Sequence, residues 1–169
     1  MSGDKPDPRL RTPMQWSAGQ AAGFTTGKPW ETLQPDTQAI NVATEDADPS
    51  SLLNLYRRLI SLRRSNDALA TGRLVPLTAG STGVIAFLRR AGDKTVLVVA
   101  NLGAAPVTGV AVQSGRDALP TGSYAAHALL GTQNGATLVV GADGQLVGYV
   151  PLVGQLRARE SVVFDMVRQ

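Results

Sequence analysis

The sequence predicts a mainly β fold, in which an antiparallel β-sandwich of seven or eight strands follows one amphipathic helix and a long irregular N-terminal loop. Two observations favour this fold. Short β-branched runs separated by turn signals fill the chain after Gly72. Six of the ten prolines lie in the first 49 residues, whereas most of the 18 glycines lie between Gly72 and Gly154. We therefore expect two regions, residues 1–72 and residues 73–169.

Residues 1–47 show neither helical nor strand periodicity, because prolines and glycines interrupt every run. This is far longer than the usual loop of about 4 to 6 residues, so the segment is either disordered or an elaborated functional loop laid on another surface. Trp16, Phe24 and Trp30 favour the second interpretation, since disordered segments are usually poor in aromatic residues.

A helix is predicted over residues 48–66. Asp48 is suited to accept hydrogen bonds from the free first-turn amides, and Pro49 is suited to the first helical position. Apolar residues then recur at spacings of three and four, which places them on one face of the helix as an apolar stripe: Leu52, Leu55, Tyr56, Leu59 and Leu62. This face is broader than a solitary surface helix needs.

Eight short runs after Gly72 are predicted to be strands: residues 73–77, 84–90, 95–101, 107–112, 124–129, 137–140, 145–151 and 161–166. Turn signals between them include Asn134-Gly135 and Asp143-Gly144, which are favoured hairpin dipeptides. Residues 96–100 are apolar on both faces and are expected to form a central strand. This spacing is typical of a sandwich or barrel.

Composition excludes several classes of protein. The formal net charge is only +3, which argues against nucleic acid and membrane partners. With no cysteine and one histidine, the chain offers no thiol nucleophile, no disulfide and no multi-histidine metal site. No apolar run reaches the roughly 18 to 20 residues of a membrane helix, and the N-terminus lacks signal-peptide features, so the compartment stays open.

Candidate catalytic residues are few. A Ser/His/Asp arrangement would have to use His127, and no Gly-x-Ser-x-Gly elbow is present. Glu45, Asp46 and Asp48 stand directly before the predicted helix, where negative charge stabilises free amides, so they favour capping over catalysis. No phosphate-binding glycine motif occurs either. We expect no catalytic residue, no metal ligand and no cofactor in this chain.

The densest motif is residues 11–16, Arg-Thr-Pro-Met-Gln-Trp, followed by Ala-Gly-Phe-Thr-Thr-Gly-Lys-Pro-Trp at residues 22–30. A cation, an amide and an indole are suited to a sugar-facing loop, because pyranose rings offer apolar faces and hydroxyl groups. Arg11, Gln15 and Trp16 are the candidate substrate-binding residues. From spacing alone, the alternative that the apolar side chains are packing anchors is favoured.

These two stretches, together with Ile-Asn-Val at residues 40–42 and the helix sequence at 48–63, resemble the C-terminal region of α-amylase-superfamily glycoside hydrolases, in particular α-glucosidases, oligo-1,6-glucosidases and trehalose synthases. The resemblance implies that residues 1–72 are the remnant of a (β/α)8 catalytic barrel, with a rim loop at 1–47 and the last barrel helix at 48–66. An antiparallel C-terminal β-domain at 73–169 would follow.

In this retaining family the catalytic aspartate nucleophile, glutamate acid/base and second aspartate lie upstream of the motif that begins here. The resemblance therefore implies a truncated fragment, in which Met1 looks like an internal methionine. It would be the C-terminal part of an enzyme acting on α-glucosidic saccharides, inactive alone. Residues that contact sugar would be limited to Arg11, with Gln15 and Trp16 as weaker candidates.

Two alternatives from other classes remain. One is a free-standing carbohydrate-binding or assembly β-module, with stacking surfaces from Trp16, Trp30, Tyr124 and Tyr149. The other is a small hydrolase using a serine and His127. The expected partners are the missing barrel portion or a second copy of the chain, because the helix stripe would otherwise be left exposed, and an α-glucosidic oligosaccharide. Without such a partner, residues 1 to about 48 would be mobile.

Overall fold

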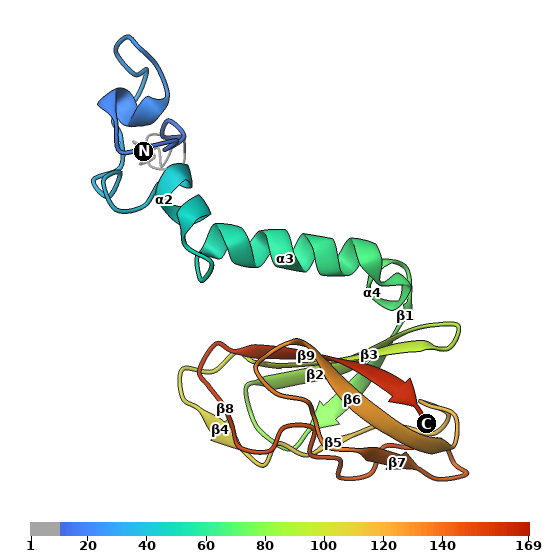
Figure 1. The fold of residues 1–169 in the computed structure, drawn as a ribbon. Helices are drawn as coiled ribbons and strands as arrows, with labels where there is room; N and C mark the ends of the chain where they lie inside the picture. Colours follow the sequence, from blue (N-terminus) through green and yellow to red (C-terminus); the bar gives the residue numbers. More distant parts are fainter. Residues whose placement is uncertain (1–10) are drawn as a thin grey trace, which may run out of the picture. The chain divides into compact units, whose positions relative to one another are not determined.

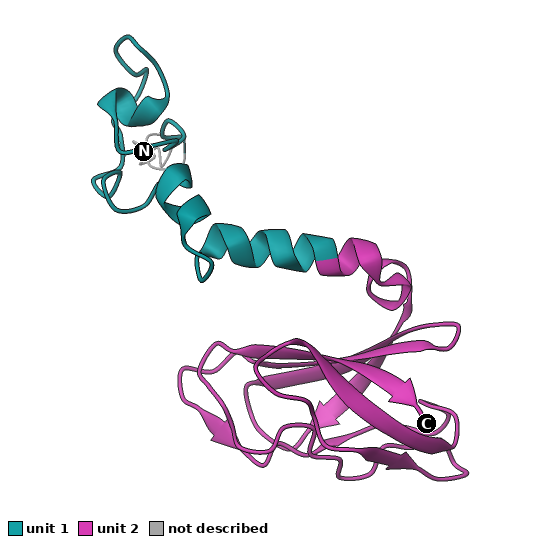
Figure 2. Ribbon diagram, viewed as in Figure 1, with its two compact units in different colours: residues 1–61 teal, residues 62–169 magenta. Residues whose placement is uncertain are grey.

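The computed structural model describes residues 11–169 (Figure 1), so the start of the expected rim loop lies outside the described residues. The chain divides into two compact units, Met1–Ser61 and Leu62–Gln169 (Figure 2). The boundary between residues 72 and 73 inferred from the change in sequence pattern stays a prediction. Within residues 11–169, no helix has both the length and the apolar character needed to cross a lipid bilayer.

Hydrogen bonds hold the irregular chain of the first unit in place. It contains the short 3-10 helix η1 (Gln20–Gly23), α2 (Val42–Ala47), which was not predicted, and most of α3 (Leu52–Ser65). The amide of Trp16 donates to the carbonyl of Ala22 at 2.8 Å, and the amide of Val42 donates to the carbonyl of Gln15 at 2.9 Å. Segments distant in sequence are therefore joined through their backbones.

Helix α3 begins later than predicted. Asp48 does not cap it: Oδ1 of Asp48 accepts from the amide and the hydroxyl of Ser50, at 2.8 and 2.7 Å, which closes a turn before the helix. The hydroxyl of Ser51 instead accepts from the amide of Asn54 at 3.1 Å. Ser51 thus takes the N-cap role, and the prediction that Asp48 caps the helix is wrong.

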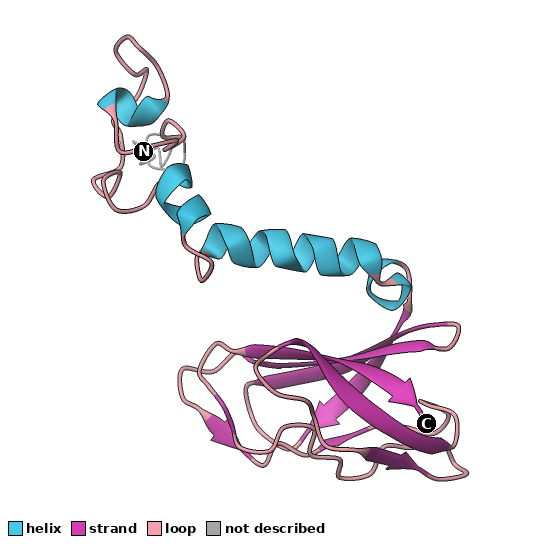
Figure 3. Ribbon diagram, viewed as in Figure 1, coloured by secondary structure: helices cyan, strands magenta, loops and turns pink. Residues whose placement is uncertain are grey.

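The second unit is an antiparallel β-domain (Figure 3), which confirms the predicted mainly β fold. One sheet has seven strands in the order β5-β1-β2-β3-β9-β6-β7, and β4 and β8 form a two-stranded sheet. The short helix α4 (Asp67–Ala70) precedes them. The strands are β1 (Arg73–Ala79), β2 (Val84–Ala91), β3 (Lys94–Asn101), β4 (Val107–Thr108), β5 (Val112–Gln113), β6 (Gly122–Leu130), β7 (Leu138–Val140), β8 (Gln155–Leu156) and β9 (Ser161–Arg168).

Strand β3 occupies the middle of the seven-stranded sheet, as its apolar sequence predicts. Val98 lies opposite Phe87 of β2 on one side and Val163 of β9 on the other. One face of the curled sheet encloses the main core, which includes Leu88, Leu97, Leu119, Leu146, Phe164 and Met166. On the other face, Ala68 of α4 packs against Val96 and Val163. Strands β3 and β9 are therefore buried from both sides.

Asn101 is a buried polar residue with a relative exposure of 1%. Its Nδ2 donates to the carbonyls of Ala105 and Arg157, at 2.8 and 2.9 Å, and its Oδ1 accepts from the amide of Gly103 at 2.9 Å. A single side chain therefore joins the end of β3 to the segment that follows β8.

Two predicted strands differ in the structure, and one strand was not predicted. Residues 107–112 form two short strands, β4 and β5, because Gly109 between them has a φ of +59°, which is incompatible with an extended strand. Residues 145–151 form no strand beyond one isolated bridge between Tyr149 and Val112. Strand β8 was not predicted. It pairs with β4. Because it has only two residues, its sequence shows no alternating pattern from which a strand could be predicted.

The dipeptide Asn134-Gly135 does not form the hairpin that its composition favours. Strand β6 ends at Leu130 and β7 begins at Leu138, so a longer loop joins them. The side-chain oxygen of Asn134 instead accepts from the amide of Ala128 at 2.9 Å. This contact lies where the β6–β9 register shifts, and it satisfies an amide at the irregularity.

Candidate functional site

The candidate sugar-facing residues lie in the first unit, on a segment that braces α2. The carbonyls of Gln15 and Trp16 accept from the amides of Val42 and Ala43, at 2.9 and 3.1 Å. Asn41 completes the start of α2, because its Oδ1 accepts from the amide of Thr44 at 3.0 Å. Free amides at a helix start need such partners. The motif segment and α2 therefore form one hydrogen-bonded piece.

The three candidate residues point to different surroundings. The guanidinium carbon of Arg11 lies 5.4 Å from the centroid of the Trp30 ring, which is cation–π geometry. Nε2 of Gln15 donates to the carbonyl of Ile40 and, at 3.4 Å, to Oδ1 of Asp36, so its amide is engaged within the loop. The Trp16 side chain is 51% exposed. The structure thus pairs Arg11 with Trp30, while Gln15 positions the loop.

The aromatic residues of the loop are not packing anchors within the described residues. Trp16 and Trp30 have relative exposures of 51% and 56%, and Met14 and Phe24 are exposed as well. The two tyrosines considered as stacking surfaces behave in the opposite way, since Tyr124 and Tyr149 are buried in the β-domain core. A stacking role for these tyrosines is therefore wrong, and Trp16 and Trp30 are the exposed indoles.

An open groove of about 570 Å³ lies within the first unit. Most of its lining is apolar and comes from Pro13, Met14, Ile40, Val42, Leu52, Leu53 and Tyr56. Thr12, Gln15, Asn41 and Glu45 are its polar residues. Glu45 is the one carboxylate among these lining residues. A retaining glycosidase requires two carboxyl groups about 5 to 5.5 Å apart, so this groove is suited to apolar contact.

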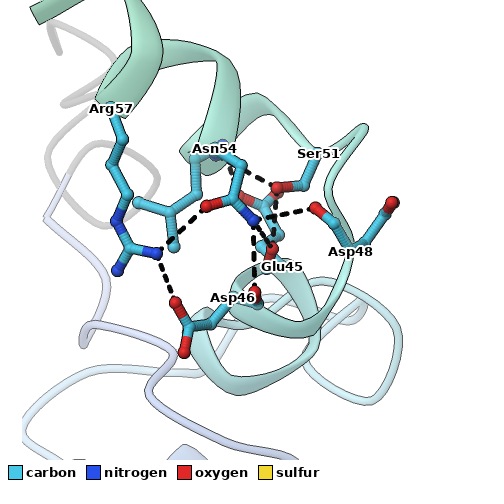
Figure 4. Close-up of polar contacts among 7 residues, drawn as sticks. Glu45, Asp46, Asp48, Ser51, Asn54 and Arg57 are labelled. Carbon is cyan, nitrogen blue, oxygen red and sulfur yellow. Dashed lines mark hydrogen bonds and ion pairs between the residues drawn. The ribbon is translucent and has the colours of Figure 1, made fainter. Parts of the chain in front are cut away.

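The carboxylates near the groove organise the junction between α2 and α3 (Figure 4). Oε2 of Glu45 accepts from the amide of Leu53 at 3.1 Å, which places its charge at the start of α3. Asp46 forms an ion pair with Arg57. Hydrogen bonds from Ser50 hold the pKa of the Asp48 carboxyl below its usual value. Each of the three acids therefore has a local structural role.

Asn54 is the residue at this junction that sequence reasoning missed. Its Nδ2 donates to the carbonyls of Glu45, Asp46 and Asp48, at 2.9, 3.2 and 2.8 Å. Its position on the polar side of the predicted helix did not indicate these contacts, because they form only when the preceding turn folds back. Arg57 also donates to Oδ1 of Asn54, at 3.1 Å, so the network is continuous.

His127 lies on β6, where it is exposed and stands opposite Asp165 of β9. Within residues 11–169, the hydroxyl of Ser123, on the same strand, donates to Oε1 of Gln169 at 3.3 Å. Nothing in this geometry assembles a nucleophile and a base. Residues 11–169 also contain no cluster of three or more histidine or acidic side chains that could hold a metal ion.

The chain combines an antiparallel β-domain with a preceding loop and helix, and the loop and helix carry an open apolar groove. Residues 1–72 match the alpha-amylase family model, described as the alpha amylase catalytic domain. Over 92 residues the chain is 40% identical to glucan 1,6-alpha-glucosidase of Streptococcus pneumoniae serotype 4 and 44% identical to trehalose-6-phosphate hydrolase of Escherichia coli K12. Each match covers 54% of this chain and 17% of the relative.

The solved structure of trehalulose synthase MutB from Pseudomonas mesoacidophila MX-45 is 32% identical to the chain, with a TM-score of 0.63. The match covers 92% of this chain and 25% of the MutB chain. The chain is therefore homologous to the C-terminal region of alpha-amylase-family glycoside hydrolases, and the resemblance inferred from its motifs is confirmed. It spans only a small part of the length of these relatives.

Proposed function

We propose that this chain is the scaffold region of an α-glucosidase-like glycoside hydrolase acting on α-glucosidic saccharides, and that it supplies none of the catalytic carboxylates. The remaining part of the catalytic domain provides the two acids that cleave the glucosidic bond. The chain alone is inactive. Its role is to complete and stabilise the catalytic domain and to carry the β-domain.

The observation that carries this proposal is the engagement of the carboxylates in residues 11–72. Glu45, Asp46 and Asp48 build the α2–α3 junction. Asp36 accepts from Gln15, at 3.4 Å, and Oε1 of Glu31 accepts from the neighbouring amide of Thr32 at 3.1 Å. Asp67 stands in the first turn of α4. These contacts support structural roles, since none sets two carboxyl groups across an open cleft.

The loop contributes the sugar contacts that this proposal assigns to the chain. Arg11 and Trp16 present a cation and an exposed indole, which suit the hydroxyl groups and the apolar face of a pyranose. Gln15 holds the same loop in place through its hydrogen bond to the carbonyl of Ile40. These contacts are made at the rim of the complete active site, where the missing acids also lie.

An activity assay tests the proposal. The purified chain is incubated with maltose, isomaltose, sucrose, starch and p-nitrophenyl α-glucoside, with trehalulose synthase MutB as the positive control. We expect no turnover by the chain. Turnover that disappears in Glu45→Gln but persists in Asn54→Ala would overturn the proposal, because it would place a catalytic acid within this chain.

A second candidate function is carbohydrate binding without catalysis, favoured by the exposure of Trp16 and Trp30. Calorimetric titration of the chain with maltooligosaccharides separates the two. Heat of binding that is lost in Trp16→Ala and Trp30→Ala would support a binding module. Heat no greater than that of dilution would argue against a binding module and favour the scaffold role.

A further inference from the structure

Within the first unit, helix α3 carries an apolar surface whose side chains are all at least partly exposed. At about 100° per residue, its side chains Leu52, Leu53, Leu55, Tyr56, Leu59 and Ile60 fall on one arc of about 160°. No residue of α3 is buried. Tyr56 and Ile60 have relative exposures of 60% and 56%. Most of the stability of a 14-residue helix comes from tertiary packing of its apolar face, so an exposed face of this width is suited to a partner.

The surface extends beyond the helix into the groove described above. Leu52, Leu53 and Tyr56 form one wall of the groove, and Met14 and Ile40 contribute to the other. Hydrogen bonds hold the walls: Gln15 bonds to the carbonyl of Ile40, and Glu45 bonds to the amide of Leu53. The arc and the groove together form one preformed apolar surface, which we call the α3 docking surface.

The family match indicates the occupant. Residues 1–72 correspond to part of a catalytic domain, and the chain covers only 25% of the solved relative. A domain is built around a common hydrophobic core. The exposed apolar surface of a segment that matches part of such a domain is therefore suited to face the rest of the domain.

A second copy of the chain fits the surface less well. Two paired helices bury a narrow seam on each partner. An arc of about 160° exceeds such a seam, so helix-to-helix pairing would leave its margins, including Ile60, in water. A wide arc continuous with a groove is suited to a partner that encloses the helix on more than one side.

We propose that the α3 docking surface binds the remaining part of an alpha-amylase-family catalytic domain, and that this binding occurs when the two parts are separate polypeptides. The proposal rests on the proposed function, because it assumes that the chain completes such a domain. It adds which surface makes the contact and that a covalent link between the parts is not required.

The test uses the full chain and trehalulose synthase MutB from which the 25% covered by this chain has been removed. The two are co-expressed and purified through a tag on the MutB part. We expect recovery of a one-to-one complex. Ile60→Asp, on the docking surface, is expected to reduce recovery at least about tenfold, whereas Ser61→Asp, on the opposite side of α3, is expected to leave it unchanged.

Two further measurements keep the outcome decisive. Sedimentation of the chain alone shows whether copies pair, and a dimer dissolved by Ile60→Asp with no complex formation would overturn the proposal in favour of a second copy. If the shortened MutB is insoluble, the chain is fused in place of the removed region. A soluble fusion that Ile60→Asp disrupts and Ser61→Asp does not supports the α3 docking surface as the contact, while an insoluble fusion or equal behaviour of the variants overturns the proposal.

The proposed function and the docking proposal fail separately. Activity of the isolated chain would contradict the first without any complex. An inactive chain that binds no catalytic-domain part would contradict the second alone.

Discussion

Asn54 and Glu45 join the start of α3 to the end of α2 through a direct hydrogen bond: Nδ2 of Asn54 donates to the carbonyl of Glu45 at 2.9 Å. The Glu45 side chain reaches forward in return, and its carboxylate accepts from the amide of Leu53 at 3.1 Å. Each residue satisfies a polar group that its partner's helix leaves free. The two helices are thus connected by side chains that belong to their termini.

Replacing this amide is expected to loosen the junction. Asn54→Ala removes three contacts with carbonyls, and we expect the first turn of α3 to lose about 1 to 2 kcal/mol of local stability. Hydrogen exchange of the α3 amides measures the effect. Ser61→Ala, on the same helix, serves as the control, and equal exchange in the two variants would contradict the role assigned to Asn54.

A buried tyrosine predicts a dependence of stability on pH. Burial raises the pKa of Tyr149 to about 12, above the ordinary value of a tyrosine, and its hydroxyl donates to the carbonyl of Ala136 at 2.6 Å. The folded state thus favours the neutral phenol, so this contribution is complete below pH 10 and is lost as the pH rises toward 12.

The phenylalanine variant separates this tyrosine from other groups that titrate at high pH. Tyr149→Phe is expected to cost about 1 to 3 kcal/mol at pH 8, because the Ala136 carbonyl loses its donor. The difference from the unmodified protein is expected to narrow between about pH 10 and 12. Urea unfolding across this range provides the measurement, and a difference that stays constant would refute the assignment.

Asn101 is expected to be among the residues whose loss most weakens the β-domain. Asn101→Ala leaves the Gly103 amide and the Ala105 and Arg157 carbonyls without their partner, and we expect a loss of about 3 kcal/mol in the free energy of unfolding. Asn134→Ala, which removes one bond to the amide of Ala128, is expected to cost about 1 kcal/mol. Similar midpoints of chemical unfolding for the two variants would be inconsistent with the Asn101 network.

The rim residues yield a kinetic prediction in the fusion of this chain with MutB. Trp16→Ala is expected to raise KM for the saccharide about tenfold, because a stacking surface is lost. Phe24→Ala, another exposed aromatic of the same loop, provides the matched control. An unchanged KM in Trp16→Ala, measured from initial rates, would remove Trp16 from the substrate-binding residues.

Periodicity predicted the elements whose residues carry a repeated pattern. The spacing of Leu52, Leu55 and Tyr56 located α3, and the doubly apolar run of β3 placed it at the centre of the sheet. The exact start of α3 was missed because Asp48 and Ser51 are both good capping residues. Which one caps depends on where the preceding turn closes, and that closure involves Ser50.

The sequence by itself determined the order of loop, helix and strands, the mainly β class and the family resemblance, because each is written in contiguous residues. Only the tertiary structure decided which side chains connect distant segments. Asn101 reaches Arg157, 56 residues away, and Gln15 reaches Ile40, 25 residues away. It also decided that Trp16 and Trp30 are exposed while Tyr149 is buried. Local pattern cannot specify these outcomes, since burial and hydrogen-bond partners depend on chain segments brought together by folding.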